Sequence, residues 1–264
     1  MATEAPQGIR IEGEQRALLA SDMHLGGHEP ALTESFLAAL DSAIEGVTEL
    51  FLLGDLFEAW IGDDSADPAA DELANALARL AHAGVRTRVL RGNRDFLLGR
   101  QPAPAKLASY PRRARFDLLE EPLVVEAFGR RVLLCHGDAL CTDDAEYQRF
   151  RTASRQAAWQ DAFLAHPVDE RERLARGYRD ASEASKQAKA EYLMDVNLAA
   201  VDRLMDDCGV DVLVHGHTHR PAVHRWLRHG RPRERWVLPD WTLAPRRGGF
   251  LRIDSVGWTR LGDW

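Results

Sequence analysis

The sequence predicts an α/β protein in which two stacked β-sheets are flanked by helices and carry an inserted helical cap. Three observations support this fold class. Short apolar runs alternate with amphipathic helical segments in the first half of the chain, the C-terminal segment alternates apolar and polar residues, and residues 145–193 are polar and helical in pattern without a strand signal. A chain of 264 residues can form one domain, residues 1–264, with that cap inserted in it.

The first half of the chain reads as strand, helix, strand, helix, strand. Residues 17–20 and 50–53 are apolar runs typical of buried strands, and residues 30–45 between them carry a helical apolar stripe. Residues 71–83 predict a second helix, followed by a strand over residues 85–90. This order favours parallel crossovers and therefore a parallel sheet.

The remainder of the chain predicts an antiparallel hairpin, a cap and a second sheet. Residues 123–128 and 131–135 form the expected hairpin, and the helical segment should break at Pro167 and at Gly177. A further strand is expected at residues 210–214, and the alternating runs 223–227, 235–238 and 250–253 suggest the second sheet.

Possible metal ligands directly follow five of the apolar runs. They are Asp22, His24, Asp55, Asn93, His136, His217 and His219. Side chains at the carboxyl ends of strands converge on one crevice in open α/β sheets, so we expect all seven to meet. Oxygen and imidazole donors suit a borderline-hard divalent ion such as Mn²⁺. Two ions with an open position for water and phosphate, bridged by Asp55, would make a phosphoesterase site.

Composition narrows the possible partners. The chain has 34 basic and 41 acidic residues, so nucleic acid is not an expected partner. Three cysteines at unpatterned spacings, the absence of a signal-peptide pattern and the lack of a long apolar run favour the cytoplasm. The cap is rich in arginine: Arg149, Arg151, Arg155, Arg171, Arg173, Arg176 and Arg179. Such a surface suits peripheral contact with an anionic leaflet, although it also suits a solvated helix face.

The ligand motifs resemble those of the calcineurin-like metallophosphoesterases, over residues 22–219. Their flanking runs, residues 53–64, 91–99 and 136–144, resemble the UDP-2,3-diacylglucosamine pyrophosphatases of lipid A synthesis. This resemblance implies a calcineurin-like fold and two Mn²⁺ ions. It implies that metal-bound hydroxide attacks the uridine-side phosphorus of UDP-2,3-diacylglucosamine, which yields UMP and 2,3-diacylglucosamine 1-phosphate (lipid X). It also implies work at the cytoplasmic face of the inner membrane, without an obligate protein partner.

The resemblance also assigns roles to individual residues. One ion would be held by Asp22, His24, Asp55 and His219, and the other by Asp55, Asn93, His136 and His217. Asp55, Asn93 and His136 would be catalytic, and the substrate contacts would be Asn93, Arg94, Asp144, Ser182, Lys186, Lys189 and His217. Independently of family, the spacing of Ser182, Lys186 and Lys189 places them on one helical face. Residues 239–241 depart from the family pattern, and we expect them to touch no proposed ligand.

Two other functions fit the same residues. A phosphodiesterase or pyrophosphatase of the superfamily would use the same metal pair on a soluble nucleotide, because metals do not choose the substrate. A metal-free protein-binding scaffold would keep only the fold. All seven ligand positions are filled in this sequence, which argues against the scaffold.

Overall fold

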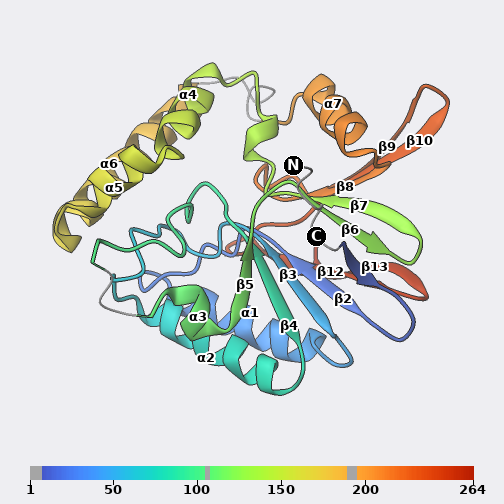
Figure 1. The fold of residues 1–264 in the computed structure, drawn as a ribbon, viewed down its shortest axis with the longest axis horizontal. Helices are drawn as coiled ribbons and strands as arrows, with labels where there is room; N and C mark the ends of the chain where they lie inside the picture. Colours follow the sequence, from blue (N-terminus) through green and yellow to red (C-terminus); the bar gives the residue numbers. More distant parts are fainter. Residues whose placement is uncertain (1–7, 105–107, 189–194) are drawn as a thin grey trace, which may run out of the picture.

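The computed structural model describes residues 8–104, 108–188 and 195–264, and its centre is a pair of facing β-sheets (Figure 1). The first sheet has the order β1 (Ile9–Ile11), β6 (Leu123–Ala127), β7 (Arg130–Leu134), β8 (Val212–His215), β10 (Arg231–Val237) and β9 (Ala222–Arg228). The second has the order β11 (Thr242–Leu243), β12 (Arg246–Asp254), β2 (Ala17–Ala20), β3 (Glu49–Leu53), β4 (Arg86–Leu90) and β5 (Phe116–Leu119), with β13 (Gly257–Asp263) paired to β12.

The side chains of each strand point alternately to the two faces of its sheet, and this alternation produces the separate core layers of the fold. In β2, Leu19 packs into the core between the sheets with residues such as Val132 of β7 and Val214 of β8. Its neighbour Leu18 faces the opposite side and joins the core under the helices, where it meets residues such as Phe36. Successive side chains of a strand point to opposite faces, so a strand that is buried on both faces reads as one continuous apolar run.

Helices cover the outer face of each sheet. The second sheet is covered by α1 (Pro30–Ala43), α2 (Pro68–His82) and α3 (Tyr110–Ala114), and the first by α7 (Leu198–Cys208) (Figure 1). The helix α2 begins three residues before the predicted start. Asp67 explains this, because its side chain accepts a hydrogen bond from the Ala69 backbone N–H at 2.8 Å, and Pro68 takes the first helical position.

The predicted topology is largely confirmed. Strand pairs β2–β3 and β3–β4 are parallel, and β6–β7 is an antiparallel hairpin. The expectation that the C-terminal runs form a second sheet of their own is wrong in part, because they divide between the two sheets. β9 and β10 extend the first sheet beside β8, whereas β12 crosses to the second and pairs with β2. Alternation predicts a strand but carries no information about its sheet.

The arginine-rich segment forms three helices, α4 (Ala145–Ser154), α5 (Ala157–Leu164) and α6 (Val168–Ala188), at the upper left of Figure 1. The predicted break at Pro167 is confirmed, because α6 begins directly after it. The predicted break at Gly177 is wrong, since α6 continues through this residue. An isolated glycine lowers helix stability by about 1 kcal/mol but does not end a helix. Among the described residues, no helix has the length and apolar character needed to cross a bilayer.

Candidate metal centre

The loops after β2, β3, β4, β7 and β8 bring the seven predicted ligands together at one edge of the sandwich. Two groups of possible ligand atoms lie within 4.8 Å of one another: Asp22, His24 and His219, and Asp22, Asp55 and His136. Asn93 and His217 adjoin the second group, since Asn93 Oδ1 lies 3.0 Å from His136 Nε2 and the His136 and His217 ring centroids are 5.1 Å apart.

The first group directs its ligand atoms at one point. The Nε2 atoms of His24 and His219 are 3.3 Å apart. Asp22 Oδ1 lies 3.4 Å from His219 Nε2 and 4.0 Å from His24 Nε2. This oxygen is buried and accepts no hydrogen bond within the described part of the chain. An unsatisfied buried carboxylate oxygen is costly, so its position beside two imidazole nitrogens fits a cation.

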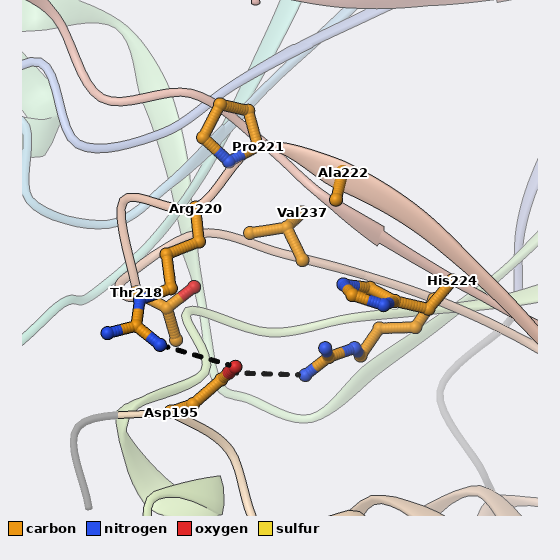
Figure 2. Close-up of a pocket in the computed structure, with 8 residues that line it drawn as sticks. Asp195, Thr218, Arg220, Pro221, Ala222, His224 and Val237 are labelled. Atoms are coloured by element: carbon orange, nitrogen blue, oxygen red, sulfur yellow. Dashed lines mark ion pairs between the residues drawn. The ribbon is translucent and has the colours of Figure 1, made fainter. Parts of the chain in front are cut away.

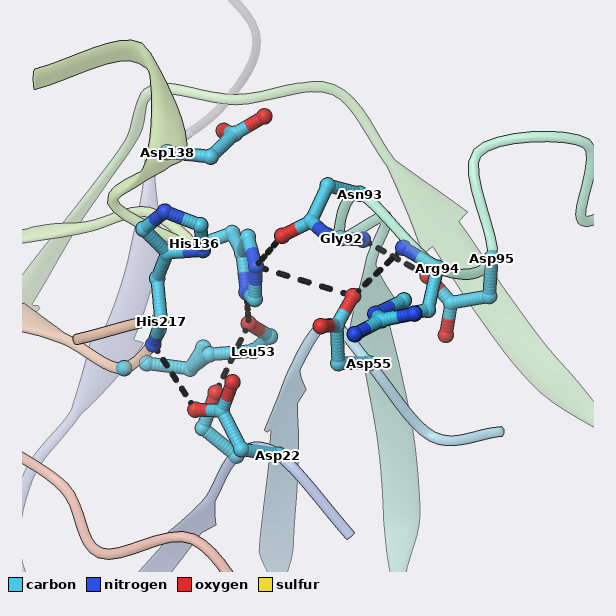
Figure 3. Close-up of polar contacts among 12 residues, drawn as sticks. Asp22, Leu53, Asp55, Gly92, Asn93, Arg94, Asp95, His136, Asp138 and His217 are labelled. Carbon is cyan, nitrogen blue, oxygen red and sulfur yellow. Dashed lines mark hydrogen bonds and ion pairs between the residues drawn. The ribbon is translucent and has the colours of Figure 1, made fainter. Parts of the chain in front are cut away.

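Figure 3 shows the second group, Asp22, Asp55 and His136. Asp55 Oδ1 is 3.6 Å from His136 Nε2 and accepts a hydrogen bond from the Arg94 backbone N–H at 2.8 Å. Asp22 Oδ2 accepts from the His217 backbone N–H at 2.8 Å. Asp22 therefore belongs to both groups, a feature that the sequence did not reveal.

Outer partners hold three of the imidazoles by the ring nitrogen that faces away from the centre. His136 Nδ1 lies 2.9 Å from the Leu53 carbonyl, His24 Nδ1 lies 3.4 Å from Glu58 Oε2, and His219 Nδ1 lies 3.3 Å from Asp240 Oδ2. Such partners fix the ring orientation and leave Nε2 for a metal. The expectation that residues 239–241 touch no proposed ligand is therefore wrong for Asp240, and also for Trp241, whose backbone N–H donates to the Asp22 carbonyl at 3.0 Å.

The backbone of the site is strained. Asp22, His24, Asp55, His217 and His219 have φ between 51° and 66°. The left-handed region costs a residue with a side chain roughly 1–2 kcal/mol, and such residues cluster at functional sites. Two glycines let the loops approach closely. A Cβ on Gly92 would lie 2.1 Å from Asp55 Oδ1, and one on Gly216 would lie 2.0 Å from Asp22 Oδ2.

The site also has supporting acidic residues that sequence reasoning missed. Buried Asp138 accepts through Oδ2 from the Tyr147 hydroxyl at 2.6 Å and from Arg151 Nε at 2.8 Å. Glu121 Oε2 accepts from the His136 backbone N–H at 2.8 Å. Asp138 lies in the run of residues 136–144 that carries the family resemblance but was given no role, whereas no sequence signal marked Glu121.

The proposed substrate contacts are only partly visible. Arg94 lies beside Asn93, with its Nη1 atom 3.6 Å from Glu58 Oε1. Asp144 caps α4, since its Oδ1 accepts from the Tyr147 backbone N–H at 3.0 Å. Ser182 and Lys186 lie on α6 but their side chains are outside the described part of the structure, and Lys189 lies outside the described residues.

Most of the cap arginines are engaged rather than free. Arg155 donates to the Gly92 carbonyl at 3.0 Å and lies over the Phe96 ring. Arg151, Arg171, Arg173 and Arg179 pair with carboxylates, while Arg149 and Arg176 are exposed. Residues 145–181 of the cap are therefore less cationic toward solvent than their sequence suggested.

Two cavities lie near the centre. One of about 270 Å³ adjoins Thr218, which separates His217 from His219 (Figure 2). Asp195 lies in it between Arg220 and Arg235, at 3.8 and 3.5 Å, so a carboxylate separates its two guanidinium groups. The other, of about 370 Å³, is lined by residues of the cap and of the β4 and β5 ends: Arg91, Phe96, Arg100, Leu119, Glu120, Glu121, Arg151, Arg155 and Gln160.

Comparison with known proteins identifies the family. The model of the calcineurin-like phosphoesterases matches residues 16–221, which include all seven candidate ligands. The chain belongs to the calcineurin-like phosphoesterase family.

Its relatives share most of its length. The chain is 47% identical over 242 residues to a UDP-2,3-diacylglucosamine hydrolase of Aromatoleum aromaticum, covering 91% of this chain and 94% of the relative. It is 48% identical over 244 residues to the hydrolase of the same name from Bordetella pertussis, with coverages of 90% and 92%. For that of Stenotrophomonas maltophilia the identity is 44% over 249 residues, with coverages of 92% and 96%. Among solved structures, Vps29 of Entamoeba histolytica with zinc is 13% identical, covers 94% of this chain and 99% of its own, and has a TM-score of 0.42, too distant to inform the site.

Membership of the calcineurin-like phosphoesterase family implies a divalent metal, and the electrostatics of the site fit one. Burial alone would lower the pKa of His136, but the carboxylates of Asp55 and Asp22 raise it to about 9. Burial lowers the pKa of His217 to about 3, and the charge of His136 acts in the same direction. The negative potential that holds a proton on His136 also favours a divalent cation at the same place.

Glu58 is ionised in this arrangement. Burial opposes its ionisation, but the hydrogen bond with His24 and the guanidinium groups of Arg94 and Arg179 lower the pKa of Glu58 to about 2. It is therefore negatively charged at neutral pH and can accept a hydrogen bond from His24.

Proposed function

We propose that this phosphoesterase hydrolyses the pyrophosphate bond of UDP-2,3-diacylglucosamine and releases UMP and 2,3-diacylglucosamine 1-phosphate, as a step of lipid A biosynthesis. The observation that carries the proposal is the identity of 44–48%, over at least 90% of the chain, to hydrolases named for that substrate. The convergence of the seven candidate ligands supports it.

We assign two Mn²⁺ ions to the site. The first would be held by Asp22, His24, Asp55 and His219, and the second by Asp55, Asn93, His136 and His217. The donor types and the two adjoining groups support this assignment. Asp22, which belongs to both groups, competes with Asp55 as the bridge. The number of ions bound per chain in Asp55→Ala and in Asp22→Ala shows which residue is the bridge. Loss of the bridging ligand should release both ions, whereas loss of a terminal ligand should release only one.

The chemistry follows from the charges around the phosphates. Divalent ions in such a site supply positive charge that activates water and neutralises the phosphate. Asn93 is a neutral oxygen donor, so it preserves the positive charge that attracts the pyrophosphate. Arg94 lies beside it and can bind a phosphate oxygen. The leaving group is a sugar phosphate, which is stable as an anion, so the chain need not supply a proton to it.

We further propose that residues 145–193 form a cap over the substrate within one domain, residues 1–264. Asp144, Ser182, Lys186 and Lys189 would contact the glucosamine and its phosphate. A lipid substrate would bring the enzyme to the cytoplasmic face of the inner membrane. Flotation with liposomes containing anionic lipid tests this, and an enzyme that stays out of the lipid fraction would contradict it.

The decisive assay compares substrates. We expect the purified protein with Mn²⁺ to release UMP from UDP-2,3-diacylglucosamine with a higher kcat/KM than it shows for ADP-ribose or bis-p-nitrophenyl phosphate. A preference for the soluble compounds would support a nucleotide pyrophosphatase instead. A protein that neither binds Mn²⁺ nor hydrolyses any of these compounds would be a scaffold.

A further inference from the structure

Glu58 joins the candidate metal centre to the cap. Its carboxylate lies after β3 and is 24% exposed. Oε2 is 3.4 Å from His24 Nδ1, whereas Oε1 is 3.2 Å from Arg179 Nη1 on α6 and 3.6 Å from Arg94 Nη1. One side chain thus contacts a candidate metal ligand, a candidate substrate contact and a cap helix residue 121 positions away in sequence.

We propose that Glu58 is a positioning residue through which the contact of α6 with the core controls the orientation of His24. This inference rests on the proposed metal-dependent function. The two guanidinium groups hold Oε1, so Oε2 faces the His24 Nδ1 atom at 3.4 Å. With the ring held by this contact, the His24 Nε2 atom points toward Asp22 and His219, where a metal ion would be bound.

His219, the other imidazole of the same ligand group, is oriented by residues of the sandwich instead. His219 Nδ1 contacts Asp240, and Asp240 is held by Arg247 of β12, whose Nε and Nη2 atoms each lie 2.6 Å from its carboxylate oxygens. Both of these residues belong to the sandwich. Within the part of the cap that the structure describes, His24 is therefore the one of the two imidazoles oriented through a residue that the cap contacts.

The direction in which loss of Arg179 changes the metal affinity distinguishes a positioning role of Glu58 from a purely electrostatic effect. Removal of a positive charge near a cation site should strengthen cation binding by Coulomb's law. If Arg179 acts by holding Glu58, its removal should instead weaken metal binding, because His24 loses its fixed orientation. Loss of an outer partner of a metal ligand typically costs 10- to 100-fold in affinity, and an indirect effect through a second residue should be smaller.

The experiment is a titration of Mn²⁺ into the full-length, chelator-treated protein by calorimetry. We expect Glu58→Gln to raise the Kd about tenfold or more and Arg179→Met to raise it about threefold or more. Arg176→Met, an exposed arginine one turn earlier on α6, is the matched control and should leave the Kd unchanged. Asp240→Asn should weaken binding, and adding Arg179→Met to it should weaken binding further.

A double-mutant cycle tests whether Arg179 affects metal binding through Glu58. In the Glu58→Gln background, Arg179→Met should have no further effect on the Kd, because the coupling is already broken. An unchanged or tighter Kd in Arg179→Met, or full additivity with Glu58→Gln, would overturn the coupling. Failure of the unmodified protein to bind Mn²⁺ would overturn the proposed function itself, so the two failures are distinguishable. Should Arg179→Met fail to fold, Arg179→Gln serves the same comparison.

Discussion

Replacement of Arg171 by methionine should release the cap from the core without unfolding the sandwich. The Arg171 side chain is 1% exposed. Its guanidinium donates two hydrogen bonds to Asp64, at 2.8 and 2.5 Å, one to the Ile61 carbonyl at 2.5 Å and one to the His166 carbonyl at 3.1 Å. The bonds to Asp64 and Ile61 connect the start of α6 to the loop that follows β3.

The magnitude follows from what the substitution leaves behind. Removal of one partner of a buried ion pair costs about 3–5 kcal/mol. The Asp64 side chain is 24% exposed and can regain some water, so the lower end of that range applies. Because 1.4 kcal/mol is a factor of ten, about 3 kcal/mol should speed hydrogen exchange of α5 and α6 by roughly 100-fold.

Hydrogen exchange measured by mass spectrometry checks this prediction. Peptides from α5 and α6 should exchange faster in Arg171→Met, while those from β3 and β4 should not change. Arg173→Met is the matched control, because Arg173 is 69% exposed and pairs with Glu170 on the surface, so exchange should change by about twofold at most. A cap effect below about tenfold, or an equal effect in the sandwich, would refute the reasoning.

Three further predictions concern single positions. His219→Gly should be more stable than His219→Ala by about 1 kcal/mol in urea unfolding without metal, because φ is 54° there; equal stabilities would contradict the strain. Gly216→Ala should weaken Mn²⁺ binding about tenfold or more, because its Cβ would lie 2.0 Å from an oxygen of Asp22. The control Gly177→Ala lies in open space on α6, so it should bind Mn²⁺ normally and be more stable by up to about 1 kcal/mol. Calorimetry compares the binding of the two variants, and thermal unfolding compares their stability. Asp67→Ala should lower the free energy of unfolding by about 1 kcal/mol through loss of the α2 cap, and an unchanged value in urea would contradict the capping role.

The strands that deliver the candidate ligands could be predicted from the sequence, because β2, β3 and β8 are short, mainly apolar runs, and β4 and β7 begin with arginine but end in apolar residues. The run before Asp55 was expected at residues 50–53 and is β3, Glu49–Leu53. Local pattern and the rule that parallel strands end at one edge sufficed to bring the seven residues together. That rule depends on topology, which the alternation of strand and helix already indicates.

Other features depend on contacts between distant segments and left no local signal. The helix α7 was not predicted, although Asn197 caps it and Gly209 ends it in the left-handed conformation. An asparagine and a glycine at such a spacing are common in loops as well, so they do not predict a helix on their own. Glu58 and Asp240 were missed for a different reason. An acidic residue that orients an imidazole looks like any surface acid until the fold places it beside the ring.

Five candidate ligands have left-handed backbone angles, and at these positions the conformational preference of the residue type disagrees most with the conformation in the fold. Residue preference would place glycine or asparagine at such positions, yet aspartate and histidine occupy them, and the cost is on the order of several kcal/mol in total. A packed sandwich can offset that cost, because its strands are buried on both faces and hold the loop ends fixed. Local preference therefore fails where the ligands must face one another. Arg115, Phe128 and His229 also have left-handed φ angles, but they are scattered at separate turns. The gathering of five such residues at one place is therefore evidence for a functional site, because strain of this kind clusters where side chains are needed in a set arrangement.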